Sequence, residues 1–292
     1  MKPTLSAGDI ASHPRLRPCI RQQALTLLSL HASNPRIASV FATQQRWLIA
    51  HAALAHYFRS AGSDLAAGCN LTSLIDVVVS HGVASRNTAD AFLKEMLKYQ
   101  YLQAAPGGDR RARPVAPAAV TLQMISAWVA THLATLDGLD GGDRRDVFLA
   151  RPASIALIQP LIADGLLRSE AIRAPSPAFS LFTWLNEGGL VMDWLIAGLA
   201  EVAPAGERIP SSVASIAELI AGLGARLNLS RTHLTRKLRM AEAMGSLGWL
   251  GERGKSTMWV SAGFVRDYHA QQSAKLAIVE SAFRSGVEAA SA

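Results

Sequence analysis

The tetrapeptide Trp-Leu-Ile-Ala occurs twice in this chain of 292 residues, at 47–50 and again at 194–197. One repeated tetrapeptide can arise by chance in a chain of this length. Several segments repeated in the same order at a similar spacing instead indicate an internal duplication. A duplication would constrain the fold strongly, because whatever one half forms the other half should form as well.

Each copy of the tetrapeptide lies in a long segment with the pattern of a helix, 34–58 in the first half and 176–202 in the second. Asn34 and Ser176 suit the N-cap position of these helices. The proline that follows each of them suits the first helical position. The segments that contain the tetrapeptides are therefore expected to be equivalent helices.

Two later landmarks recur in the same order. When 71–97 and 215–244 are aligned on their shared Ser-Arg pair, apolar positions coincide at an offset of 145. Each copy then reaches a short strand-like segment with an aromatic residue, 99–102 or 247–250, followed by a Gly-rich basic turn and another helical run. The sequence therefore predicts two similar domains, joined near 136–146.

Composition narrows the class of protein. Half of the residues are hydrophobic and few are aromatic, which is typical of a well-buried helical protein. The net charge of +7 and the pI near 9.8 favour an anionic partner.

Cys19 and Cys69 stand alone, as in a reduced, cytoplasmic chain. Polar residues and prolines interrupt the apolar stretch 148–167, and 188–200 is short, so no contact with a membrane is expected.

In the first copy, a helix over 71–81, a tight turn over 82–84 and a helix over 85–98 form the helix-turn-helix pattern. A hairpin over 99–116 and a helix over 117–136 follow. The second helix begins at an N-cap serine and has a buried stripe of Ala89, Phe92, Leu93, Met96 and Leu97. Its other face carries the candidate DNA contacts Arg86, Asn87, Thr88, Lys94 and Lys98, together with Asp90.

The residue types on that face suit a DNA groove. Arg86 could reach guanine or phosphate and Asn87 an adenine edge, whereas Lys94 and Lys98 would meet phosphates. A charged helix face is usually only a solvated surface, however, and for the two lysines considered alone that interpretation is favoured.

The second copy has the same layout and a more cationic face. Ser230 is its expected N-cap, and Leu234 and Leu238 are its expected buried positions. The exposed set comprises Arg231, Thr232, Thr235, Arg236 and Arg239. A turn over 251–257 carries Arg253 and Lys255, and 258–260 is the expected return strand. Both copies thus pair a basic helix with a basic hairpin, which favours contact with double-stranded DNA.

The hairpin of the first copy carries a resemblance to a known family. Asp109, Arg110, Arg111 and Val115 are similar to the Asp-x-Arg wing and following strand of winged helix-turn-helix regulators of the MarR type. The resemblance implies that Arg111 reaches the minor groove and that Asp109 braces the turn. Arg110 and Arg113 are further candidate DNA contacts of the same wing. Two prolines, Pro114 and Pro117, depart from the family pattern and predict a short or irregular return strand.

The resemblance implies a mainly α fold with small β-wings, in which two winged-helix domains pack through long helices as a pseudo-dimer. The expected division is a tail over 1–20, a first domain over 21–142 and a second over 143–292. Helices over 117–136 and 262–286 are expected in the central layer, together with Trp47 and Trp194. The resemblance also implies a small-molecule effector, and the chain would act as a monomeric pseudo-dimer or as a homodimer.

The expected function is therefore a sequence-specific DNA-binding transcriptional regulator that reads two non-identical half-sites. The eight histidines are scattered, and neither HExxH, a P-loop nor GxSxG is present, so no catalytic residue, metal or cofactor is expected. Two alternatives stay open: a plasmid-type replication initiator with two winged helices, and a winged-helix protein-docking module.

Overall fold

A computed structural model was analysed. It describes residues 3–33, 41, 43–61, 68–105, 114–183, 188–200, 207–212, 231–253 and 255–289. Most of these residues are helical, and two small antiparallel sheets accompany the helices. The expectation of a mainly α chain with small β elements is therefore confirmed.

Up to residue 140 the described elements, in chain order, are α1 (Ala7–Ala11), α2 (Leu16–Ser33), α4 (Gln44–Ala61), α5 (Leu71–Ser80), α6 (Arg86–Lys98), β1 (Leu102–Ala104), β2 (Val115–Pro117) and α7 (Ala119–Asp140). Beyond it they are α8 (Arg144–Ala150), η2 (Pro152–Ser154), α9 (Ile155–Arg168), α10 (Glu170–Arg173), α11 (Pro177–Thr183), α12 (Gly188–Ala197), β3 (Arg208–Pro210), α14 (Arg231–Ala243), β4 (Leu247–Trp249), β5 (Met258–Ser261) and α15 (Ala262–Ala289).

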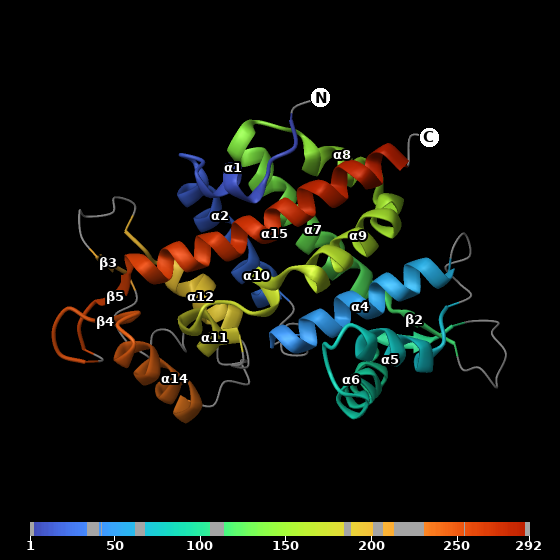
Figure 1. The fold of residues 1–292 in the computed structure, drawn as a ribbon, viewed down its shortest axis with the longest axis horizontal. Coiled ribbons are helices and arrows are strands. Elements are labelled where there is room, and N and C mark those ends of the chain that lie inside the picture. Colours follow the sequence, from blue (N-terminus) through green and yellow to red (C-terminus); the bar gives the residue numbers. More distant parts are fainter. Residues whose placement is uncertain are drawn as a thin grey trace.

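Long helices from both halves of the chain form one central layer (Figure 1). The packing across it is reciprocal: α2 packs on α12 while α9 packs on α4, and α1 packs on α15 while α8 packs on α7. A single cluster of buried apolar side chains extends through the molecule. The two halves of the chain therefore share one core.

The two sheets lie at opposite ends of this layer (Figure 1). At one end β1 pairs with β2, and Cys69 forms an isolated bridge with Val115 on the other side of β2. At the other end the strand order is β3-β5-β4. Cys69, which precedes α5, therefore pairs with β2, the strand that leads into the long helix α7. In the same way β3 pairs with β5, the strand that leads into the long helix α15.

Both helices that contain the tetrapeptide differ from the prediction. The helix predicted over 34–58 begins at Gln44, because Thr43 precedes it as a cap and its hydroxyl accepts a hydrogen bond from the Arg46 amide at 3.3 Å. Residues 34–40 lie outside the described part. The segment predicted as one helix over 176–202 contains the separate helices α11 and α12. The second of these stops at Ala197, because the backbone then turns to pair Leu199 with Ser211.

The N-terminal residues are part of the fold, which corrects the expectation of a tail over 1–20. Ser6 and Asp9 form a capping box at the start of α1. Ile10, Leu16 and Ile20 are buried against the central layer. These three apolar side chains recur every four to six positions. Both α1 and the first turns of α2 can therefore turn an apolar side towards the central layer.

A buried arginine fastens the turn between α7 and α8. The Arg144 guanidinium donates to Glu280 of α15 at 2.6 Å, to Asp140 at 2.7 and 2.8 Å and to Asp137 at 3.1 Å. Glu280 is fully buried and also accepts from Arg284 at 2.6 Å. These carboxylates raise the pKa of Arg144 above its usual value. The cluster links two consecutive helices, α7 and α8, to α15 near the other end of the chain.

Helix α7 is long and apolar enough by composition to cross a membrane, as is the bent pair of Arg144–Ala150 with Pro152–Arg168 if it is taken as one span. In this structure α7 packs on α2, α8 and α15, and several of its side chains are fully buried. The position of α7 in the shared core therefore explains why this helix is so apolar.

Candidate nucleic-acid interface and central cavity

The first candidate interface is built by α5, a tight turn and α6. The Asn70 side chain caps α5 by accepting from the Thr72 amide at 2.7 Å. Gly82 in the turn has a φ of 62°, a left-handed conformation that favours glycine. Ser85 caps α6, as predicted, and accepts from the Thr88 amide. The turn and the N-cap therefore lie where the sequence predicts them.

The burial of α6 follows the predicted stripe. Ala89, Phe92, Leu93 and Met96 are buried and Leu97 is half-buried. Every candidate DNA contact on this helix is exposed, namely Arg86, Asn87, Thr88, Lys94 and Lys98. The predicted face of α6 is thus available to a partner.

Two of the three cations of that face already pair with acidic side chains, and the third lies over an aromatic ring. Arg86 forms an ion pair with Asp76 of α5, and Lys94 pairs with Asp90 at 2.8 Å. The Lys98 ammonium lies over the Tyr99 ring, 5.8 Å from its centroid. The electrostatic potential of α6 is consequently weaker than the number of its cations indicates.

The tip of the first hairpin falls outside the described part of the chain. Asp109, Arg110, Arg111 and Arg113 belong to this segment, so the structure does not test the roles predicted for them. Its two strands are three residues each, and Leu102 faces Pro117 across them. The return strand is short, as the prolines predicted.

The second candidate interface contains α14, with Leu234 and Leu238 fully buried as predicted. Thr232, Arg236 and Arg239 are exposed and Thr235 is half-buried. Within the described residues neither Arg236 nor Arg239 forms an ion pair. The side chain of Arg231, the N-cap Ser230 and the preceding helix predicted from 215 lie outside those residues. The described face of α14 is therefore more strongly cationic than that of α6.

The hairpin after α14 is held by strand pairing and by side-chain contacts. Strands β4 and β5 pair with Trp249 opposite Met258, and the Trp259 indole donates to the Trp249 carbonyl at 3.2 Å. Arg253 lies over the Trp249 ring and pairs with Glu242 of α14 at 2.9 Å. Lys255 pairs with Glu252 at 2.7 Å. The two predicted wing cations are thus present at the surface, and each is held by an acidic neighbour.

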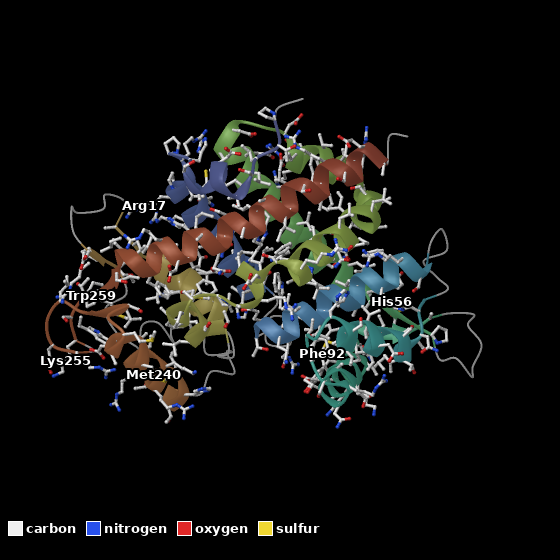
Figure 2. The ribbon with its side chains drawn as sticks, viewed as in Figure 1. Arg17, His56, Phe92, Met240, Lys255 and Trp259 are labelled. Atoms are coloured by element: carbon white, nitrogen blue, oxygen red, sulfur yellow. The ribbon has the colours of Figure 1, made fainter. Side chains whose placement is uncertain are left out.

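The two candidate helices lie apart from each other along the same long edge of the molecule, away from both chain termini (Figure 1). Lys255 and Trp259 are near α14, whereas Phe92 of α6 lies further along this edge, nearer the middle of the molecule (Figure 2). One extended partner could therefore meet both helices at once.

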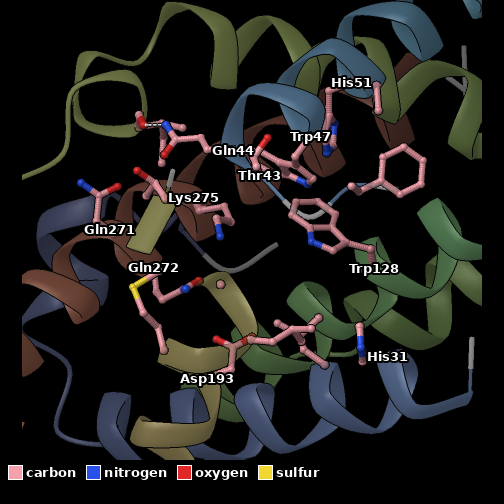
Figure 3. Close-up of a pocket in the computed structure, with 18 of the residues that line it drawn as sticks. His31, Thr43, Gln44, Trp47, His51, Trp128, Asp193, Gln271, Gln272 and Lys275 are labelled. Atoms are coloured by element: carbon pink, nitrogen blue, oxygen red, sulfur yellow. Dashed lines mark hydrogen bonds between the residues drawn. The ribbon is translucent and has the colours of Figure 1, made fainter. Parts of the chain in front are cut away.

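A cavity of about 320 Å³ lies in the central layer between helices from both halves of the chain. Its volume is within the range of small-molecule sites. Aromatic side chains form one wall, where the Trp47 and Trp128 ring centroids are 5.9 Å apart and His51 packs edge-on to both (Figure 3). Trp47 thus packs in the central layer as predicted, and it also faces this cavity.

Buried polar groups line the rest of the cavity. The Lys275 side chain of α15 and the Asp193 carboxylate of α12 both point into it (Figure 3). Burial raises the pKa of Asp193 to about 6, and the Tyr268 hydroxyl, which donates to this carboxylate, opposes that shift. Burial lowers the pKa of Lys275, and Asp193 opposes that shift. The cavity therefore contains one acid and one base in a largely dry setting.

Two buried histidines complete the lining. Burial lowers the pKa of His31 to about 4 and that of His51 to about 3, so both are neutral at pH 7. Both ring nitrogens of His31 lack a hydrogen-bond partner among the described residues, as does Nδ1 of His51. Buried polar groups are normally satisfied, so these atoms are free to bond a guest molecule or water.

No feature of the sequence predicted this cavity. Asp193 lies in the short apolar stretch 188–200, and Lys275 belongs to no motif. Neither cysteine lines this cavity; burial raises the pKa of Cys69 to about 11, and Cys19 is half-buried. The described residues include no cluster of three or more metal-binding side chains.

No family model matches this chain. Comparison with curated proteins and with solved structures likewise finds no match.

Proposed function

We propose that this protein is a sequence-specific DNA-binding transcriptional regulator in which two winged helix-turn-helix units of the MarR type are fused as a single-chain pseudo-dimer. The observation that carries the proposal is the repeated element order. In each half, an exposed basic helix is followed by an antiparallel hairpin and then by a long central helix.

The arrangement of the two helices supports the proposal. A recognition helix enters the major groove, and two such helices on one face of a dimer read half-sites about one helical turn apart. Here α6 and α14 lie on one edge, and the reciprocal packing of the long helices holds them in a fixed relation. The net charge of +7 suits a polyanionic partner.

The two units differ in their chemistry. On α6, Asn87 and Thr88 offer base-reading groups beside cations that are already paired. On α14, Arg236 and Arg239 have no ion-pair partner among the described residues. We therefore propose that α14 supplies more of the electrostatic affinity, that α6 supplies discrimination between bases, and that the two half-sites differ in sequence.

One observation favours the docking alternative. Met240 of α14, Met244 just after this helix and Leu250 directly after β4 are large apolar side chains with 44%, 47% and 58% of their surface exposed. A contact between proteins would bury them, and a DNA backbone would not. Replication initiation instead predicts binding to repeated origin sequences.

Selection of bound sites from random duplex DNA with the purified full chain tests the proposal. We expect an imperfect palindrome with half-site centres about 34–36 Å apart or a multiple of this spacing. Arg236→Ala should weaken duplex binding, whereas Arg168→Ala should leave it unchanged, because Arg168 lies on α9 in the central layer. No enriched site, or equal effects of the two variants, would exclude the DNA-reading function and favour docking. Enrichment of direct repeats would favour replication initiation.

A further inference from the structure

The charged groups of the central cavity do not neutralise each other directly. Within the described residues, Lys275 has no hydrogen-bond or ion-pair partner, and its ammonium lies over the Trp47 ring, 5.4 Å from the centroid. Asp193 accepts a hydrogen bond from Tyr268 but forms no ion pair with Lys275. Burial of a charge is costly unless the charge is paired, so both groups are suited to a guest that brings their partners.

The distribution of polarity in the cavity restricts the shape of such a guest. Trp47, Trp128 and His51 form an aromatic wall whose rings are inclined to one another by 56–71°, so it offers both ring faces and ring edges to another planar ring. Lys275 and Asp193 point into the space beside this wall (Figure 3). A guest that fits needs a ring on one side and its polar groups together on the other.

Charge balance restricts the guest further. The cavity already contains one cation and one anion, so a purely anionic guest would leave Asp193 with an uncompensated like charge, and a purely cationic guest would do the same to Lys275. A guest that carries both charges satisfies both groups and adds no net charge to the core.

We propose that the cavity binds a small aromatic zwitterion, namely a free aromatic amino acid or a close analogue. Its carboxylate would bind the Lys275 ammonium, its ammonium would bind the Asp193 carboxylate, and its ring would pack against Trp47 and Trp128. The site is separate from α6 and α14, and it is tested without DNA. It can therefore fail or succeed independently of the proposed DNA-binding function.

Calorimetric titration of the purified full chain tests the charge requirement with matched ligands. The first series is L-tryptophan, tryptamine (which lacks the carboxylate) and indole-3-propionate (which lacks the ammonium). The second is L-phenylalanine, phenethylamine and 3-phenylpropionate, which covers a smaller ring. In at least one series the amino acid should bind roughly 10- to 100-fold tighter than either partial analogue, as expected for one charge-assisted hydrogen bond. Equal or tighter binding of a partial analogue, or no binding in either series, would overturn the proposal.

Two variants locate the charges. In Lys275→Met the amino acid should bind no better than its amine analogue, since the group that recognises the carboxylate is gone. In Asp193→Asn it should bind no better than its acid analogue. Arg168→Met, at a position on α9 whose side chain is 77% exposed, should change neither ratio. Loss of affinity for all three ligands by the same factor would mean that these residues only maintain packing, and this would contradict the proposal.

Discussion

The arginine cluster at the junction of the two halves makes a quantitative prediction about stability. Arg144→Met removes a guanidinium whose side chain is 6% exposed and which bonds three carboxylates. The change leaves Glu280 fully buried with Arg284 as its remaining cation, and it leaves Asp137 and Asp140 facing each other. Removing one partner of a buried ion pair costs about 3–5 kcal/mol, because the other charge remains uncompensated.

The effect should be visible in thermal unfolding. For a chain of this size, 1 kcal/mol corresponds to a shift of about 2 °C, so the melting temperature of Arg144→Met should fall by roughly 6–10 °C. The neighbouring Arg145→Met is the control. Its side chain is 52% exposed and its pair with Asp146 spans 3.6 Å, so its stability should change by less than about 0.5 kcal/mol.

A double variant separates the ion pair from general packing. In Arg144→Met with Glu280→Met, no buried carboxylate is stranded on α15, so the double variant should be more stable than the sum of the two single effects predicts. Strictly additive effects, or an Arg144→Met protein that melts within 2 °C of the parent, would show that the cluster does not hold these helices together.

Further predictions concern salt, pH and helix packing. Replacing Arg236 and Arg239 together by alanine should reduce the slope of log affinity for duplex DNA against log salt by about 1.8 if both contact phosphate, and an unchanged slope would contradict this. In urea unfolding, the free energy of unfolding should fall as the pH is lowered from 6.5 towards 4. Each buried histidine should contribute up to about 1.4 kcal/mol per pH unit, because it binds a proton in the unfolded chain but not in the folded chain. Asp193, with its raised pKa, opposes this trend with a single proton, and a flat profile would contradict neutral burial of His31, His51 and His132. Gly286→Ala should lower the free energy of unfolding by about 1–3 kcal/mol, since the added Cβ would lie 2.6 Å from an isoleucine side chain of α9. Gly189→Ala has open space around it, so thermal unfolding should show no loss of stability for this variant.

The parts of the fold that could be predicted from sequence are those decided locally. Ser85 predicts the start of α6 because its hydroxyl caps the helix. Gly82 predicts the preceding turn because that turn needs a residue in the left-handed conformation. The buried positions of α6 and α14, including Leu234, follow from helical periodicity alone. The strands after each helix were also located from their composition, to within three residues.

The remaining features depend on contacts between distant segments. Thr43 caps α4, but a threonine alone does not mark a helix start, so the start of α4 could not be placed from its pattern. Ile10 is buried only because α15, from the other end of the chain, covers it. In the same way, Asp193 and Lys275 face one cavity because α12 and α15 meet there. No spacing in the sequence indicates that meeting.

The reciprocal packing of the helices has a consequence for biosynthesis. Helix α4 is covered by α9, whose first residue, Ile155, follows Ala61, the last residue of α4, by 94 positions. At translation rates of about 5–20 residues per second, the apolar face of α4 remains uncovered for roughly 5–20 s after it leaves the ribosome. We therefore expect the N-terminal half to expose apolar surface of the kind that chaperones bind during synthesis, and a chain truncated near residue 140 to have an incomplete core.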